Sequence, residues 1–264
     1  MSQKFSYQNS NPTVEIFSQG EEIVTGQVAD TNAAWLSQQL VKIGFTLTRH
    51  SAVGDKLTDL IDLLAEIVHR RPDCCICTGG LGATCDDLTA EAVAKAFDLP
   101  LQFDAIAFAQ ISDFYYRRNT IMPDINRKQA MLPYSALRID NPVGTAPGFC
   151  LSYQNCWFVF LPGVPSEMQH LFTETVVTDL KNRFSPHPSQ LVTIKTRDIG
   201  ESQLQEKMNQ LSLPKQVQLG FRASLDEVHT KLLFPPAYAV TDVAMLVAQV
   251  VEKIGETVFA VEGL

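Results

Sequence analysis

The segment CTGGLGATCDDLT, residues 77–89, decides the fold. It follows an apolar run that begins at Cys74, and it places three glycines within four residues. A short apolar run that ends at glycines is typical of a buried strand in a parallel sheet. Glycines directly after such a strand let the chain turn tightly into the next element. The segment therefore predicts a buried strand, a glycine-rich loop and a helix.

Strands and helices alternate on both sides of this segment. The near-continuous apolar character of the strands favours a sheet that is covered on both faces. We predict an α/β fold with a mostly parallel sheet sandwiched by helices. The predicted strands are residues 14–17, 45–50, 74–77 and 157–161, and the predicted helices include 34–43, 57–69, 88–96, 103–116, a short one at 126–130, and one opened by the segment 162–168.

The chain divides into two predicted domains. We expect a flexible tail at residues 1–12 and a large α/β domain at 13–183. The segment 184–190 is rich in Pro and Ser and is typical of a linker. A small α+β domain is predicted at 191–264, with strands at 191–195, 217–221 and 228–234 and helices at 202–211 and 240–254.

Composition excludes several classes of protein. The net charge of -8 argues against unspecific binding to nucleic acid or anionic lipid, because both require a positive face. No apolar run approaches the length of a membrane span, and the polar N-terminus has no secretory h-region, so we expect a cytoplasmic protein with no membrane partner. The six cysteines are expected to be reduced and mostly buried, and not metal ligands.

The glycine loop fits neither of two common phosphate loops. The Rossmann fingerprint needs another glycine beyond Gly82, and the Walker loop needs Gly-Lys-Ser/Thr. Backbone N–H groups and a helix N-terminus still suit a phosphate. Asp86 and Asp87 would repel a bare phosphate, and a divalent cation between them and the phosphate would remove the conflict. In the alternative interpretation, one aspartate caps the helix with the aid of Thr89 and the glycines only form a tight turn.

Other charged residues follow the neighbouring strands. Glu21 and Glu22 come after the first strand, Asp55 comes after the second, and Arg127 and Lys128 offer positive charge. Open α/β sheets bind ligands at the carboxyl ends of their strands, so we expect these loops to converge. Glu167 is interpreted as a favourable charge at a helix start rather than as a catalyst.

Several motifs carry a resemblance to a known family. TGGLGATCDDLTAEA, NRKQA, NPVGTAPGF and LPGVPSEM occur in that order, and the opening segment GEEIVTGQVADTNAAWL precedes them. Together they resemble the N-terminal domain of the competence/damage-inducible CinA proteins, a branch of the molybdopterin-binding (MoCF) fold. The tail segment GESQLQEKM is similar to the family's small KH-like domain. The sequence departs from the family at Ala83, where a proline is usual, and at Cys85.

The resemblance implies hydrolysis of the pyrophosphate of ADP-ribose, or of a similar nucleoside diphosphate conjugate, to AMP and ribose 5-phosphate in pyridine-nucleotide recycling. A divalent metal ion (Mg, Mn or Co) is the implied cofactor. Two alternatives stay open: a molybdopterin-binding or adenylyl-transfer role, and a non-catalytic nucleotide-binding module. Full-length members continue into a nicotinamide mononucleotide amidohydrolase domain, so deamidase activity is expected to be absent here. A homodimer that binds no nucleic acid is the default expectation.

The candidate site residues follow from the loops and from the resemblance. The predicted catalytic residues are Asp87, Asp55 and Lys128, with Lys128 neutralising charge on the leaving phosphate. The predicted metal ligands are Asp87, Asp55 and Glu21. Asp86 is expected to cap the helix or to support Asp87. The predicted substrate-binding residues are Gly20, Gly79, Gly80, Gly82, Thr89, Asn126, Gly144, Thr145, Pro162 and Gly163.

Overall fold

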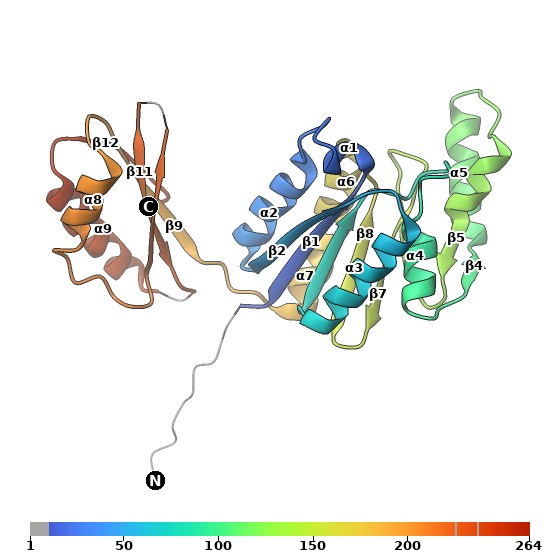
Figure 1. Cartoon of the computed structure of the whole chain (residues 1–264), viewed down its shortest axis with the longest axis horizontal. Coiled ribbons are helices and arrows are strands. Elements are labelled where there is room, and N and C mark those ends of the chain that lie inside the picture. Colours follow the sequence, from blue (N-terminus) through green and yellow to red (C-terminus); the bar gives the residue numbers. More distant parts are fainter. Residues whose placement is uncertain (1–10, 225, 237) are drawn as a thin grey trace, which may run out of the picture. The chain divides into compact units, whose positions relative to one another are not determined.

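The computed structural model describes residues 11–224, 226–236 and 238–264 (Figure 1). Residues 1–10 of the predicted flexible tail lie outside this part of the chain. The chain forms two compact units, Met1–Pro186 and His187–Leu264. The predicted linker, residues 184–190, spans the boundary between them.

The first unit is built on a six-stranded sheet with the order β2-β1-β3-β8-β7-β6. Four strands, β2, β1, β3 and β8, are parallel, and β7 and β6 are antiparallel to their neighbours. The mostly parallel sheet is thus confirmed. The strands are β1 (Thr13–Gln19), β2 (Thr46–Val53), β3 (Cys74–Thr78), β6 (Leu137–Ile139), β7 (Gly148–Tyr153) and β8 (Cys156–Leu161).

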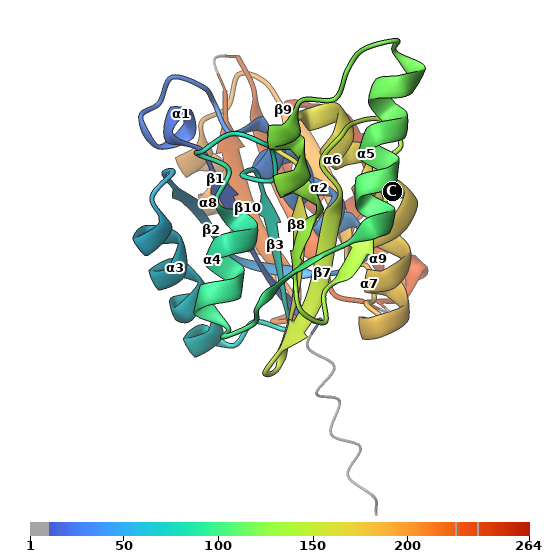
Figure 2. The ribbon, with the colours of Figure 1, turned by 90° about the vertical axis from the view of Figure 1, so that its right-hand side faces the viewer.

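Helices cover both faces of this sheet (Figures 1 and 2). On one face, α2 (Thr31–Ile43), α6 (Pro165–Leu171) and α7 (Val177–Phe184) contribute to one apolar core, and a π-helical segment, η2 (Phe172–Val176), joins the last two. On the other face, α3 (Leu57–Arg70) and α4 (Thr89–Ala96) contribute to a second core. A short helix, α1 (Glu21–Val24), follows β1. Every residue of β3 and β8 is buried, as a strand between two helical layers requires.

Local signals set the bounds of α2. The Asp30 side chain accepts a hydrogen bond from the Ala33 N–H, which caps the first turn. Gly44 ends the helix in the left-handed conformation, with φ of 104°. Leu36 and Leu40 lie on the buried face. The same signals are present in the sequence, which is why this helix was predicted.

A smaller extension follows α4. It consists of β4 (Leu101–Phe103), α5 (Ala105–Arg117), the 3-10 helix η1 (Asp124–Ala130) and β5 (Met131–Pro133). β4 and β5 form a two-stranded antiparallel sheet. The helices predicted at 103–116 and 126–130 are present, and the second is 3-10 rather than α.

The second unit is a small α+β domain. Its antiparallel sheet has the order β10-β11-β9-β12, and α8 and α9 share an apolar core with it. The elements are β9 (Gln190–Thr196), α8 (Glu201–Met208), β10 (Gln218–Ala223), β11 (Val228–Phe234), α9 (Val240–Ile254) and β12 (Val258–Glu262). The last strand was not predicted, because its identity depends on pairing with β9, about 60 residues earlier in the chain.

All six cysteines are free thiols, and five of them are buried, as expected. Burial raises the pKa of Cys156 to about 12, so this thiol is unreactive near neutral pH. Cys85 in the glycine loop is the exposed one. Among the described residues, no helix is both long enough and apolar enough to cross a membrane.

Candidate functional site

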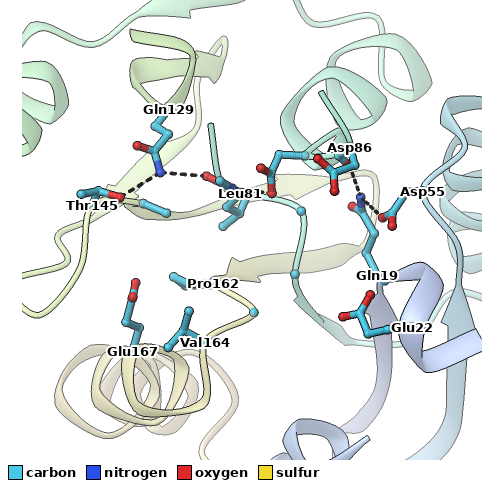
Figure 3. A pocket seen from close by; sticks show the side chains of 17 residues that line it. Gln19, Glu22, Asp55, Leu81, Asp86, Gln129, Thr145, Pro162, Val164 and Glu167 are labelled. Atoms are coloured by element: carbon cyan, nitrogen blue, oxygen red, sulfur yellow. Dashed lines mark hydrogen bonds between the residues drawn. The ribbon is translucent and has the colours of Figure 1, made fainter. Parts of the chain in front are cut away.

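The four parallel strands end at one edge of the sheet, and the loops that follow them enclose a pocket (Figure 3). Its cavity volume is about 340 Å³. The pocket therefore lies where an open α/β sheet is expected to bind a ligand. Its lining residues are Gln19, Gly20, Glu22, Asp55, Gly79, Gly80, Leu81, Gly82, Asp86, Asp87, Gln129, Thr145, Ala146, Pro162, Gly163, Val164 and Glu167.

The glycine loop forms one wall of the pocket. Gly79 and Gly80 have φ angles of 106° and 67°, which only glycine adopts without strain. The Gly79 N–H donates to the Leu161 carbonyl (3.0 Å), and the Gly82 N–H donates to Asp87 Oδ1 (2.7 Å). The N–H groups of Gly80 and Leu81, between them, donate to no other described residue. The amides that remain for a ligand are thus those of Gly80 and Leu81, not those of all three predicted glycines.

Asp87 closes the glycine loop on itself. Besides the Gly82 N–H, its carboxylate accepts hydrogen bonds from the N–H and the hydroxyl of Thr84, at 2.8 and 2.6 Å. The next helix, α4, begins after Leu88 with no side-chain cap, so the capping role considered for Asp86 and Asp87 is not realised. Asp87 lines the pocket, but three donors within its own loop already hold its oxygens.

Gln19 lies against the glycine loop, on the same wall of the pocket. It ends β1, and its side-chain amide donates to Asp55 Oδ1 (2.9 Å) and to the Asp86 carbonyl (3.0 Å). Its side-chain oxygen accepts a hydrogen bond from the buried Thr89 hydroxyl, which also donates to the Gly79 carbonyl at 2.9 Å. One side chain therefore ties together the ends of β1, β2 and β3 and the start of α4.

Asp55 is held from two sides. One oxygen accepts from Gln19, and the other accepts from the backbone N–H of Glu21 at 2.9 Å. The Glu21 carboxylate itself lies against Gly54, at a position that a β-carbon on this glycine would overlap. Asp55 thus fixes the loop after β2 to the start of α1.

Gln129 brings the 3-10 helix η1 to the pocket. Its amide donates to Thr145 Oγ1 (3.1 Å), and its oxygen accepts from Asn126 Nδ2 (2.8 Å). Lys128, on the same element, donates to the Thr84 carbonyl of the glycine loop. The pKa of Asp86 lies below its ordinary value, mainly because of the nearby Thr84 and to a smaller degree because of the Lys128 charge.

Glu167 stands on the far side of the pocket, in the first turn of α6 (Figure 3). Asn141 Nδ2 donates to its Oε2 at 2.7 Å. The carboxylate occupies the space that a β-carbon on Gly144 would need. Burial raises the pKa of Glu167 above its ordinary value, and the Asn141 hydrogen bond opposes this shift only in part.

The residues present do not fit the predicted divalent metal ion. In the described part of the chain, no three His, Cys, Asp or Glu side chains form a group that could hold a metal. Asp55 and Asp87 already accept two and three hydrogen bonds from protein donors. Glu21 does not line the pocket. The metal remains a prediction from the resemblance, and no chemical step is derived through it.

The structure brings most of the predicted site residues into this pocket. Nine of them line it: Gly20, Asp55, Gly79, Gly80, Gly82, Asp87, Thr145, Pro162 and Gly163. Four others do not line it but contact residues that form it: Glu21, Thr89, Asn126 and Gly144. Lys128 does not line it either, and it contacts Thr84 of the glycine loop.

Sequence reasoning singled out neither Gln19 nor Gln129, and it interpreted Glu167 as a helix-dipole charge. All three line the pocket. The one sequence signal for Glu167 is its place two residues after Pro165, at the start of the helix that follows β8.

Comparison with known proteins gives consistent results. The family described as "Probable molybdopterin binding domain" matches residues 15–182. A "CinA-like protein" of Shewanella frigidimarina (strain NCIMB 400) is 36% identical over 248 residues, which cover 94% of this chain and 58% of that protein. The "Nicotinamide-nucleotide amidohydrolase PncC" of Shewanella oneidensis is 38% identical over 220 residues, which cover 83% of this chain and 52% of that protein. This chain thus spans little more than half the length of these relatives.

One solved structure is also similar. The crystal structure of CinA from Thermoplasma acidophilum, described as being of unknown function, superposes with a TM-score of 0.59 at 32% sequence identity. The match covers 64% of this chain and 99% of that chain.

These findings correct the predicted function. The hydrolysis of ADP-ribose is wrong, because the matched relative named for an activity is an amidohydrolase of a nicotinamide nucleotide and not a pyrophosphatase. The molybdopterin, adenylyl-transfer and non-catalytic alternatives are not better supported.

Proposed function

This chain belongs to the CinA-like family and carries its molybdopterin-binding-type domain, and on that premise we propose that it binds a nicotinamide nucleotide of the kind that the named relative hydrolyses. The pocket at the carboxyl ends of β1, β2, β3 and β8 is the proposed site that recognises the nucleotide. The name of one matched relative, a nicotinamide-nucleotide amidohydrolase, supports this choice of substrate.

The charge of the pocket is the observation that carries the proposal. Its lining contains five carboxylates, Glu22, Asp55, Asp86, Asp87 and Glu167, and none of the lining residues is Lys, Arg or His. Such a pocket repels an ordinary anionic nucleotide. Nicotinamide mononucleotide differs from the common nucleotides because its pyridinium ring carries a positive charge. A ligand with a cationic ring and an anionic phosphate offers a positive group to Glu167, which stands across the cavity from Asp55 and Asp86, and an anionic group to the free amides of the glycine loop.

The phosphate would lie against the glycine loop. The N–H groups of Gly80 and Leu81 are the available donors there, and uncharged backbone donors suit a phosphate in an otherwise acidic pocket. This turn of the chain requires a positive φ at residue 80, which glycine adopts without strain.

The size of the pocket agrees with a mononucleotide. Its cavity of about 340 Å³ lies at the lower end of the range for small-molecule sites, which is roughly 300 to 1,000 Å³.

Calorimetry on the purified chain tests the proposal. Three ligands are titrated: nicotinamide mononucleotide, its reduced form with an uncharged ring, and AMP. We expect one saturable site and a preference of roughly tenfold or more for the cationic ring, corresponding to about 1.4 kcal/mol. A folded protein that does not bind nicotinamide mononucleotide, or binds AMP and the reduced form equally well, would contradict the proposal.

A further inference from the structure

The five carboxylates of the pocket differ in what they contact. Asp87 receives three hydrogen bonds inside the glycine loop, and Asp55 receives two, from Gln19 and from the Glu21 N–H. These protein donors already stabilise their negative charges. Asp86 and Glu22 are exposed to solvent. None of these four carboxylates is both buried and short of partners.

Glu167 is the exception. It is partly buried, and the donor that reaches it is the neutral amide of Asn141. Among the described residues, no Lys, Arg or His forms an ion pair with it. The charged form of a carboxylate is destabilised when it is withdrawn from water without a positive partner. Burial accordingly raises the pKa of Glu167. A positive group on a ligand would restore the missing interaction.

The loop 141–146 holds Glu167 in this position. Asn141 also accepts hydrogen bonds from the N–H groups of Val143 and Gly144, at 3.2 and 3.0 Å, and donates to the Ala146 carbonyl at 2.8 Å. The absence of a side chain at Gly144 makes room for the carboxylate. The acid is therefore fixed at the pocket wall by contacts on its outer side, and it stands across the cavity from Gln19, Asp55 and Asp86 (Figure 3).

We propose that Glu167 is the specificity-determining residue of the pocket, and that it selects nucleotides with a positively charged base by pairing its carboxylate with the ring. The inference rests on the proposed function and extends it, because it assigns the recognition of the ring to one side chain. The opposite ends of the ligand are thereby assigned to opposite walls, with the phosphate at Gly80 and Leu81 and the ring at Glu167.

The test compares E167Q with E174Q. Gln has nearly the shape of Glu and can still accept the Asn141 hydrogen bond, but it carries no charge. Glu174 lies two helical turns further along the same helical run, is exposed, and does not line the pocket, so E174Q is the matched control. Dissociation constants are measured by calorimetry for nicotinamide mononucleotide and for its reduced form, and thermal unfolding confirms that each variant is folded.

In E167Q, we expect binding of nicotinamide mononucleotide to weaken roughly 10- to 100-fold, as for the loss of a charged partner. Binding of the reduced form should change less than about threefold, so the preference for the cationic ring disappears. E174Q should behave as the unmodified protein, and E167D, which keeps the charge, should retain part of the preference.

Two outcomes would overturn the inference. In one, E167Q binds nicotinamide mononucleotide as tightly as the unmodified protein does. In the other, E167Q weakens both ligands equally, which would indicate a structural role only. If the unmodified protein shows no preference for the cationic ring, the proposed function itself fails. That result is seen without any substitution and is therefore distinct from the two E167Q outcomes.

Discussion

At the scale of single residues, Gln19 shows how one side chain can organise a site. The residue is 4% exposed, and its side-chain amide joins Asp55, the Asp86 carbonyl and Thr89. These partners are 36, 67 and 70 residues away along the chain. A neutral amide is suited to this place because it donates two hydrogen bonds and accepts one. A carboxylate of the same shape could donate neither of these two hydrogen bonds.

The substitution Q19E tests this role. It removes both donors and places a negative charge beside Asp55, so the free energy of unfolding should fall by about 1–3 kcal/mol, and the affinity for nicotinamide mononucleotide should fall roughly tenfold or more. Urea unfolding and calorimetry measure the two effects. Q38E, on the exposed side of α2, is the control and should leave both values unchanged. An unaltered affinity in a folded Q19E protein would show that Gln19 does not position the glycine loop.

Gly80 gives a second prediction at this scale. Its φ is 67°, and a β-carbon there would overlap the side-chain oxygens of Gln19 and Thr89. Gly26 has a similar φ of 74° but open space around it. G26A should therefore cost only the left-handed backbone strain, about 1–2 kcal/mol. G80A should lose more stability than G26A in urea unfolding and should also lose nucleotide binding. Equal losses in the two variants would mean that the contacts of Gly80 are unimportant.

At the scale of elements, the stability of helix α5 depends on its N-cap residue, Asp104. Asp104 Oδ1 accepts hydrogen bonds from the N–H groups of Ile106 and Ala107, both at 2.9 Å, and its carboxylate pairs with Arg138 at 2.7 Å. Burial alone would raise the pKa of Asp104, but the Ala107 N–H and Arg138 together outweigh it, and the pKa lies below its usual value of 3.8. The carboxylate form thus stabilises the fold.

The pH dependence of stability follows from this shift. Because the pKa of Asp104 is lower in the folded state, its contribution is fully present above the unfolded pKa and is lost as the pH falls through the folded pKa. D104A should cost about 1 kcal/mol or more at pH 7, and this difference from the unmodified protein should shrink toward pH 3. Urea unfolding at several pH values measures it. D113A, which breaks only an exposed ion pair on the same helix, should cost less than about 0.5 kcal/mol. A D104A effect that is constant with pH would contradict the account.

At the scale of the whole molecule, the two units have separate cores. Every residue that lines the pocket lies in the first unit, between Gln19 and Glu167. The pocket is thus built from residues of the first unit.

This separation predicts that a fragment of residues 1–186 binds nicotinamide mononucleotide with nearly the affinity of the whole chain, within about threefold. Calorimetry on both proteins, with circular dichroism to confirm folding, is the measurement. A folded fragment that binds more than tenfold more weakly would show that the second unit takes part in recognition.

The sequence predicted those parts of the molecule that depend on neighbours along the chain. Helix α2 has its cap at Asp30 and its end at Gly44, and β3 is a continuous apolar run, so both are visible locally. Strand β7 was not predicted, because its place depends on pairing with β8 and β6. Non-local pairing of this kind leaves little trace in a short segment.

The same reasoning separates the predicted from the unpredicted parts of the site. The glycine loop is a local signal and was found. Asp87 was given a metal-binding role because the sequence does not show that its carboxylate turns back to Gly82 and Thr84. Gln19 and Glu167 are ordinary polar residues at a strand end and a helix start, and only the fold reveals what they contact.

The most direct test of the central claim is a crystal structure of the chain with nicotinamide mononucleotide bound. The account predicts that the phosphate oxygens lie within hydrogen-bond distance, roughly 2.7–3.2 Å, of the N–H groups of Gly80 and Leu81, and that the pyridinium ring contacts the Glu167 carboxylate. A nucleotide bound outside this pocket, or bound with its phosphate beside Glu167, would contradict it.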